Sequence, residues 1–381
     1  MKKIYWRPHR VSNTALFLIA ALSIAGFIAV ESIKVKTKQR FYDEKLIAAR
    51  LTRNAMEVIK HERLKRGIPI DPEVDPTQSG LLGLPMSPVT SDTGFIQAKQ
   101  CSVNPNWAAV LVHLLKLAGC KEGDIVAVGP SGSFPVINIA AYAAIQTLKL
   151  RPIIISSAAA SQFGANVPDL LWINMERILF DRHIFGFRSV AASRGGLDDR
   201  GFGMPKESRK LLDDAIVREG IQLIDVKTST EGTDRRMQIY AEQAGGRPVK
   251  AYINIGGGTA SVGSTVNKKL FKPGLNRTPP RGAASTDSVM SRFANEGVPV
   301  IHMVYVTELA QRYGLPLQPS TIPPIGEGAV FTKQEYNIYL AVVVLALIVL
   351  AMFAFIRMDI GFRILRATKR DDKAAHPEQM V

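Results

Sequence analysis

The chain of 381 residues is long enough for two average domains, and its 48 lysines and arginines exceed its 33 aspartates and glutamates, giving a formal net charge of +15 at pH 7. Its composition, 46% hydrophobic and 21% charged, is that of a folded protein and excludes disordered and fibrous classes. The positive charge favours an anionic partner. No helix-turn-helix, zinc-finger or aromatic-basic RNA motif accompanies it, so we expect no nucleic-acid binding.

Two apolar runs near the chain ends predict transmembrane helices over 14–33 and 336–356. A cleaved signal peptide is the alternative for the first run, but the run is long for one and no small-residue cleavage motif follows it. Basic residues crowd the outer segments 1–13 and 357–381, which the positive-inside tendency places in the cytoplasm. The part between the two spans is therefore expected outside the cytoplasm.

The part between the spans divides into three segments. Residues 34–66 contain no Gly or Pro and repeat apolar side chains near helical spacing, which predicts a stalk helix that packs on its own domain or on a partner helix. Residues 67–95 are rich in Pro, Gly and Ser without periodicity and predict a linker. A soluble α/β domain is then expected over 96–332.

Within that domain, short β-rich runs alternate with amphipathic helical segments, which is typical of a mainly parallel sheet. The expected strands are 124–128, 152–156, 221–225, 251–255 and 298–304, and the expected helices are 136–149, 169–180, 206–218, 233–245 and 307–313. The predicted fold class is α/β, with a mainly parallel, doubly wound (Rossmann-like) sheet flanked by N- and C-terminal transmembrane helices. The two cysteines, Cys101 and Cys120, fit either one bridge or two separate thiols and lack metal-ligand spacing.

Three expected strands end in loops of small polar residues. These loops contain Ser131, Gly132 and Ser133; Ser156 and Ser157; and Gly256, Gly257, Gly258 and Thr259. Loops at the carboxyl ends of strands in a doubly wound sheet meet over one crevice, where free N–H groups bind an anion. Tight turns and helix caps would explain the same residues without a ligand. We predict a carboxylate or phosphate site if the loops converge, with the basic loop 268–281 guiding an acidic chain towards it.

Two enzymatic interpretations compete with simple binding. The run from Gly129 to Ser133 approaches the nucleophile elbow GxSxG, and Ser131, Asp225 and His302 follow one another in the order of an α/β-hydrolase triad. A chain with several strand ends offers such residues by chance, so they are weak catalytic candidates. The run of three glycines before Thr259 resembles an ATPase phosphate turn, but Asn254 replaces the usual Asp and no complete P-loop occurs. The sequence predicts no metal and no cofactor, and whether the protein is an enzyme is left open.

Three blocks, Asn104–Val110, Gly123–Pro135 and Asn254–Gly263, framed by an apolar helix at each end, resemble the poly-gamma-glutamate system protein family. Members are bacterial membrane proteins associated with the synthesis and export of the capsule polymer poly-γ-glutamate. The resemblance implies an accessory subunit in the bacterial cytoplasmic (inner) membrane, beside the amide ligase and the membrane components of that pathway, and it carries over no catalytic residue.

Together these features predict a membrane-anchored subunit that binds glutamate units or the anionic polymer through its strand-end loops. One alternative is a serine hydrolase or transferase that acts on the polymer through Ser131. The other is a scaffold that docks partner subunits through its helices.

Overall fold

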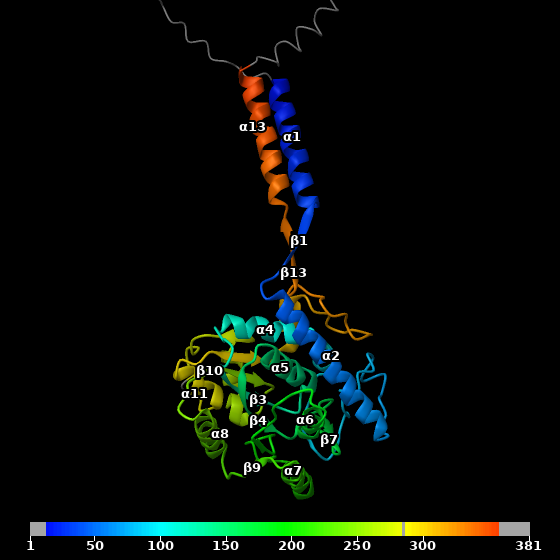
Figure 1. Ribbon diagram of the computed structural model, residues 1–381, viewed down its shortest axis with the longest axis vertical. Coiled ribbons are helices and arrows are strands. Elements are labelled where there is room, and N and C mark those ends of the chain that lie inside the picture. The colour runs from blue at the N-terminus through cyan, green and yellow to red at the C-terminus, as the bar shows by residue number, and fades with distance from the viewer. Residues whose placement is uncertain (1–12, 284–285, 358–381) are drawn as a thin grey trace, which may run out of the picture. The chain divides into compact units, whose positions relative to one another are not determined.

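The computed structural model describes residues 13–283 and 286–357, with side chains to residue 355. The chain forms two compact units: one joins the residues up to Thr37 with those from Lys333 onward, and the other is Lys38–Thr332 (Figure 1). Most of the basic residues predicted to set the membrane orientation, in segments 1–13 and 357–381, lie outside the described residues.

The first unit contains two apolar helices and a short two-stranded sheet. Helices α1 (Asn13–Ser32) and α13 (Ile338–Arg357) lie side by side, and strand β1 (Lys34–Lys38) pairs with β13 (Thr332–Tyr336). Both helices are long and apolar enough to cross a membrane, and their apolar side chains are mostly exposed to the surroundings. Gly26 lies directly against Val344, because the absent side chain lets the helices approach. The pair matches the two predicted spans and supports membrane association.

The second unit is built on a seven-stranded sheet in the order β11-β12-β10-β3-β4-β8-β9. The strands are β3 (Ile125–Pro130), β4 (Arg151–Ser157), β8 (Ala191–Ser193), β9 (Gln222–Ile224), β10 (Val249–Ile255), β11 (Gly274–Asn276) and β12 (Val300–Met303). All pairings are parallel except that of β11 with β12. From β3 the chain adds β4, β8 and β9 on one side, and then β10 and β12 on the other. The predicted mainly parallel α/β sheet is confirmed.

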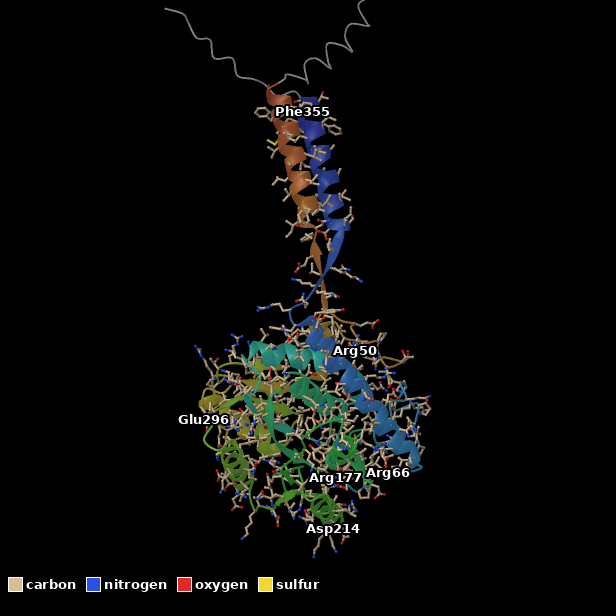
Figure 2. All side chains as sticks on the ribbon, viewed as in Figure 1. Arg50, Arg66, Arg177, Asp214, Glu296 and Phe355 are labelled. Carbon is tan, nitrogen blue, oxygen red and sulfur yellow. The ribbon has the colours of Figure 1, made fainter. Side chains whose placement is uncertain are left out.

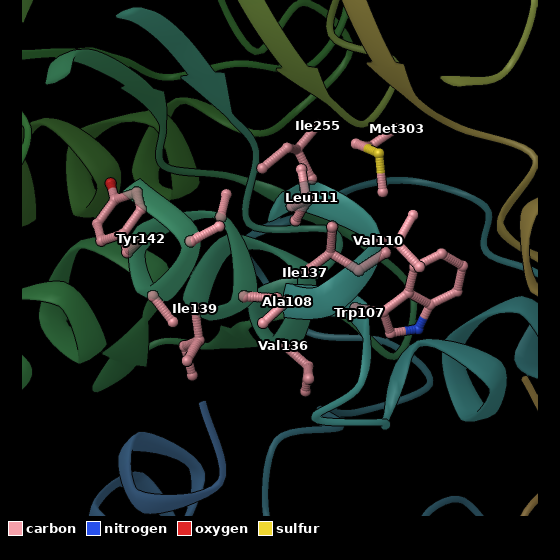
Figure 3. Close-up of a cluster of buried hydrophobic side chains, with 14 of the residues drawn as sticks. Trp107, Ala108, Val110, Leu111, Val136, Ile137, Ile139, Tyr142, Ile255 and Met303 are labelled. Carbon is pink, nitrogen blue, oxygen red and sulfur yellow. The ribbon is translucent and has the colours of Figure 1, made fainter. Parts of the chain in front are cut away.

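Helices cover both faces of this sheet, because the central strands carry apolar side chains on both faces. One face packs against α4 (Trp107–Leu117) and α5 (Pro135–Thr147), with α2 (Tyr42–Lys65) outside them, and Figure 3 shows the core formed there around Trp107, Leu111 and Ile137. The other face packs against α8 (Ser229–Ala244) and α11 (Val289–Asn295). Helices α6 (Trp172–Asp181), α7 (Lys206–Arg218) and α12 (Val306–Tyr313) complete the layers.

The smaller elements lie mainly in the connections. They are α3 (Ile96–Ser102), α9 (Thr259–Val262), α10 (Thr265–Leu270), β2 (Thr90–Asp92), β5 (Ala160–Ser161), β6 (Asn166–Val167) and β7 (Leu170–Leu171). Strand β2 pairs with β5, and β6 pairs with β7. These short pairs fix the long loop after β4 against the rest of the domain.

The predicted stalk helix is part of the folded domain. Residues 34–38 form strand β1, and the helix begins only at Tyr42. From there it buries Ala48, Ala55 and Ile59 completely, against α4 and α5. The apolar stripe seen in the sequence therefore covers the core of its own domain, which was one of the two expected uses.

The predicted linker 67–95 is also an ordered part of this domain. Arg63 on α2 donates to the carbonyls of Gly80 (3.1 Å) and Pro69 (2.7 Å), and the buried carboxylate of Asp75 accepts from Ser79 (2.8 Å). Arg63 thus pairs backbone carbonyls that have no helix or sheet partner, and Asp75 pairs a buried hydroxyl. A Pro- and Gly-rich composition thus marks irregular structure here, and the folded unit begins at Lys38.

Candidate functional site

The loops after β3, β4 and β10 meet at the carboxyl edge of the sheet. Ser131, just after β3, forms a parallel β-bridge with Ser157, the last residue of β4. The Ser131 N–H donates to Ile255 O (3.1 Å), and the Gly132 N–H donates to Ser157 O (3.2 Å). Gly256 follows β10 with a φ of 97°, and a Cβ added there would lie 2.2 Å from Ser131 Oγ. Only glycine allows this approach. The three loops that the sequence singled out therefore form one surface.

The loop after β10 carries unpaired hydrogen-bond donors. A Cβ added at Gly258 would lie 3.8 Å from Ser157 Oγ, and Thr259 Oγ1 donates to Gly196 O (3.2 Å) in the loop after β8. Within residues 13–283 and 286–357, the backbone N–H groups of residues 257–260 donate to no acceptor. A row of free N–H groups in one short loop is suited to binding an anionic oxygen.

A cation stands beside this loop. Lys268 on α10 places its Nζ so that a Cβ added at Gly257 would lie 3.0 Å from it, and the same Nζ is 5.8 Å from the centre of the Tyr305 ring. No carboxylate in the described part of the chain forms an ion pair with Lys268. The unpaired donors and an uncompensated positive charge thus occur side by side.

A buried ion pair supports the β4 side of the surface. Arg236 on α8 lies 2.9 Å from an Asp199 carboxylate oxygen, and its Nη2 also donates to Ser193 Oγ (2.6 Å) and Ser157 Oγ (3.4 Å). Arg236 and Asp199 are only 1% and 2% exposed, so the charge of Arg236 is matched internally. Arg236 therefore positions the two serines and is not an open anion-binding group.

Two of the predicted ligand-binding residues point away from this surface. Ser156 is completely buried, with its Oγ 2.6 Å from Ser189 Oγ, because successive side chains of a strand face opposite sides of the sheet. Ser133 Oγ accepts from the Ser161 N–H (3.1 Å). Ser156 therefore does not reach the surface formed by the three loops, and Ser133 faces the loop that carries Ser161.

Ser131, Asp225 and His302 do not form a triad. Asp225 follows β9 and accepts from Arg194 (2.8 Å), whereas His302 lies on β12, with its Nδ1 2.9 Å from Asn254 Nδ2. Five strand spacings separate β9 from β12, about 24 Å at ~4.8 Å each. Burial lowers the pKa of His302 to about 4, so the ring is neutral and its Nδ1 accepts a hydrogen bond from the side-chain amide of Asn254. The three residues therefore follow one another in the chain order of a hydrolase triad but do not share a site.

A depression lies elsewhere on the surface, near α6, and is lined by Arg66, Arg177 and Arg218 together with Asp169, Asp181 and Glu219. Figure 2 labels Arg66 and Arg177, which stand close together at this side of the domain. Arg177 forms an ion pair with Asp181 (2.7 Å). Since the lining charges offset one another, this depression is a weaker anion site than the one beside Lys268.

The cysteines and the acidic residues offer no metal chemistry in the described part of the chain, where no three His, Cys, Asp or Glu side chains cluster at metal-binding distance. Cys101 and Cys120 are separate buried thiols, and burial raises the pKa of each to about 12. Both therefore remain protonated and unreactive at neutral pH.

Sequence reasoning missed several residues at this edge, namely Lys99, Asp199 and Arg236. Each lies in a helix or turn without a motif, and its place becomes visible only when the strand ends are assembled. Lys268 belonged to the predicted basic loop, yet nothing in the sequence distinguished it from Lys269.

The chain matches no protein-family model, no curated protein and no solved structure.

Proposed function

We propose that this protein is a membrane-anchored accessory subunit that binds a carboxylate-rich ligand, poly-γ-glutamate or its glutamate units, at the carboxyl edge of its α/β unit. The observation that carries the proposal is the free N–H row of residues 257–260 beside the unpaired ammonium of Lys268. The three sequence blocks that resemble the poly-gamma-glutamate system family supply the identity of the ligand.

The arrangement of the sheet supports this site. The strand order reverses between β3 and β10, and the candidate loops follow these two strands and β4. In doubly wound, Rossmann-like sheets, such a reversal opens a crevice between the loops, and ligands bind there. We therefore propose that the sheet is doubly wound and Rossmann-like, with its ligand site at this reversal.

The mode of binding follows from the groups present. A ligand carboxylate would accept from the N–H groups of Gly257 and Gly258, and Lys268 would offset its charge. The hydroxyls of Ser131 and Ser157, each 7% exposed, lie at the floor of the same surface. Each successive glutamate of the polymer carries another carboxylate, so Lys272, Arg277 and Arg281, further along the same basic segment, would hold the chain as it leaves the site.

The two apolar helices complete the proposal. They would span the bacterial inner membrane as a multi-pass anchor, with the α/β unit on the extracytoplasmic side and the amide ligase and membrane subunits of the pathway as partners. This orientation follows the basic terminal segments, which the positive-inside tendency retains in the cytoplasm.

The test is the affinity of the detergent-solubilised full chain for oligo-γ-glutamate. Lys268→Gln should weaken binding about tenfold, equivalent to about 1.4 kcal/mol, and flatten its dependence on salt, because the variant loses one cation at the ligand. Lys269→Gln is the matched control, since Lys269 is the next residue of α10 and is exposed. Equal effects of both substitutions, or no binding by the unchanged protein, would overturn the proposal.

A further inference from the structure

A buried amine lies at the same edge of the sheet, next to the loop of Ser131–Ser133. Lys99 on α3 is 2% exposed, yet none of the described carboxylates forms an ion pair with it. Its Nζ lies 2.7 Å from Ser161 Oγ, donates to the carbonyl of Ser133, and stands 4.3 Å from the centre of the Phe134 ring. Among the described residues, the hydrogen-bond partners of this amine are thus a carbonyl and a serine hydroxyl.

These surroundings favour the neutral amine. Burial removes the ammonium from water and lowers the pKa of Lys99 to about 7, a shift that the nearby Asp92 opposes. A neutral amine has two N–H groups and one lone pair. With an N–H directed at the carbonyl of Ser133, the lone pair is free to accept the hydroxyl proton of Ser161.

Ser161 is placed where a ligand can reach it. It ends strand β5, is only partly buried, and donates its N–H to Ser133 Oγ (3.1 Å). The neighbouring Gly164 packs against the carbonyl of Gly132, so this segment lies directly beside the first of the three converging loops. Ser131, by contrast, has no lysine or histidine among its hydrogen-bond partners in the described residues; its Oγ accepts from the Ser133 N–H (3.4 Å).

We propose that Ser161 is a nucleophile activated by Lys99, and that the two residues form a serine–lysine acyl-transfer dyad. Ser161 Oγ would add to the carbonyl carbon of an amide or ester while its proton moves to Lys99 Nζ. The carbonyl–nitrogen or carbonyl–oxygen bond then breaks, and the ammonium returns that proton to the leaving amine or alcohol. Water or an acceptor amine, deprotonated by the same lysine, releases the acyl group and regenerates Ser161.

The substrate class follows from the neighbouring surface. An acyl compound bearing a carboxylate would place its anionic group at the loop of residues 257–259 and its carbonyl towards Ser161. This substrate class rests on the anion site of the proposed function, whereas the dyad itself is formed by other atoms, those of Lys99 and Ser161, and does not require that the ligand be poly-γ-glutamate.

The experiment is labelling of the detergent-solubilised full chain with a fluorophosphonate probe, followed by peptide mass spectrometry. Attack by Ser161 forms an oxygen–phosphorus bond and expels fluoride, and Lys99 takes the proton. Lys99→Met should slow the labelling by on the order of 10²-fold, the usual contribution of a general base. Lys149→Met, which removes a 70% exposed lysine side chain, is the matched control and should leave the rate unchanged.

The pH profile of the unchanged protein supplies a second readout, which remains valid even if Lys99→Met does not fold. Only deprotonated Lys99 can accept the proton, so the rate should rise with pH through a midpoint of about 7. Labelling at Ser131 instead of Ser161, no labelling at all, or a flat profile would overturn the dyad. No oligo-γ-glutamate is used in this test, so its outcome is separate from that of the binding experiment.

Discussion

The two serines that end strand β4 lead to two buried polar clusters of opposite character. Ser157 faces the cluster of Arg236, Asp199 and Ser193, which contains one charge of each sign, and it remains 7% exposed at the surface formed by the β3, β4 and β10 loops. Ser156 is fully buried and joins Ser189, Glu176 and Tyr142, in which no side chain supplies a positive charge through a hydrogen bond. Two consecutive residues of one strand therefore lie in different surroundings: Ser157 is at a surface that a ligand can contact, and Ser156 is in the closed interior.

The two buried carboxyl groups, those of Asp199 and Glu176, have different hydrogen-bond partners. Both oxygens of Asp199 accept from Arg236, and one also accepts from Ser193 Oγ (2.6 Å), so this carboxylate has a buried cationic partner. Burial raises the pKa of Glu176 to about 7, although hydrogen bonds from Tyr142 and Ser189 oppose the rise. A buried carboxylate is costly unless a cation is paired with it, and Glu176 has no such hydrogen-bonded partner.

The largest effect is expected when the negative charge is removed from the buried ion pair of Arg236 and Asp199. Asp199→Asn keeps a residue that tolerates the left-handed φ of 61° but leaves Arg236 without its counter-ion. The free energy of unfolding should fall by about 3–5 kcal/mol, measured by urea denaturation of the full chain in detergent.

The matched control is Asp225→Asn, which removes one of the two carboxylate partners of Arg194, at a side chain that is 62% exposed. It should cost less than about 1 kcal/mol, because water screens the exposed pair. Similar losses for both variants would show that the buried pair contributes no more than a surface one.

The next prediction concerns Glu176 and pH. Its pKa is about 7 in the folded protein and 4.5 as the ordinary value, so between these values the folded state binds more protons than the unfolded state. The contribution of Glu176 to stability is thus fully present below about pH 4.5 and is lost as pH rises to about 7. The total change is on the order of 3 kcal/mol.

Glu176→Gln removes this titration, so the variant should gain stability relative to the unchanged protein as pH rises through that window. Parallel denaturation midpoints of the two proteins across the window would mean that Glu176 is already ionised in the fold. Glu207→Gln, at an exposed position in the first turn of α7, is a suitable control.

Much of this arrangement follows from local sequence. The β-branched runs of β3, β4, β10 and β12 predicted the parallel strands, and the polar residues after three of them predicted loops that the structure brings together. Strand β8 was missed because Ala191–Ser193 is too short to show a pattern. The pairing of Arg236 with Asp199 joins residues 37 positions apart, and no local signal encodes it.

The choice between Ser156 and Ser157 shows a finer limit. Both follow the same apolar run, and either could begin the loop, so composition cannot say which one faces the crevice. Both residues pair with β8, so the answer depends on the register of the strand in the sheet, since alternation fixes each side chain to one face. Lys99 was missed for a similar reason, because a single lysine between Ala98 and Gln100 gives no sign that it will be buried.

The same two serines give the smallest and most direct test of the comparison. Ser157→Ala removes a hydroxyl from the crevice and should weaken binding of oligo-γ-glutamate by about 1 kcal/mol, roughly fivefold, with little change in unfolding free energy. Ser156→Ala leaves Ser189 Oγ without its 2.6 Å partner and should lower the unfolding free energy by about 1–2 kcal/mol, with affinity unchanged. Measuring affinity and denaturation on both variants gives four values. A loss of affinity in Ser156→Ala alone would mean that the ligand is recognised from the other face of the sheet, and the crevice at the β3, β4 and β10 loops would no longer be the binding site.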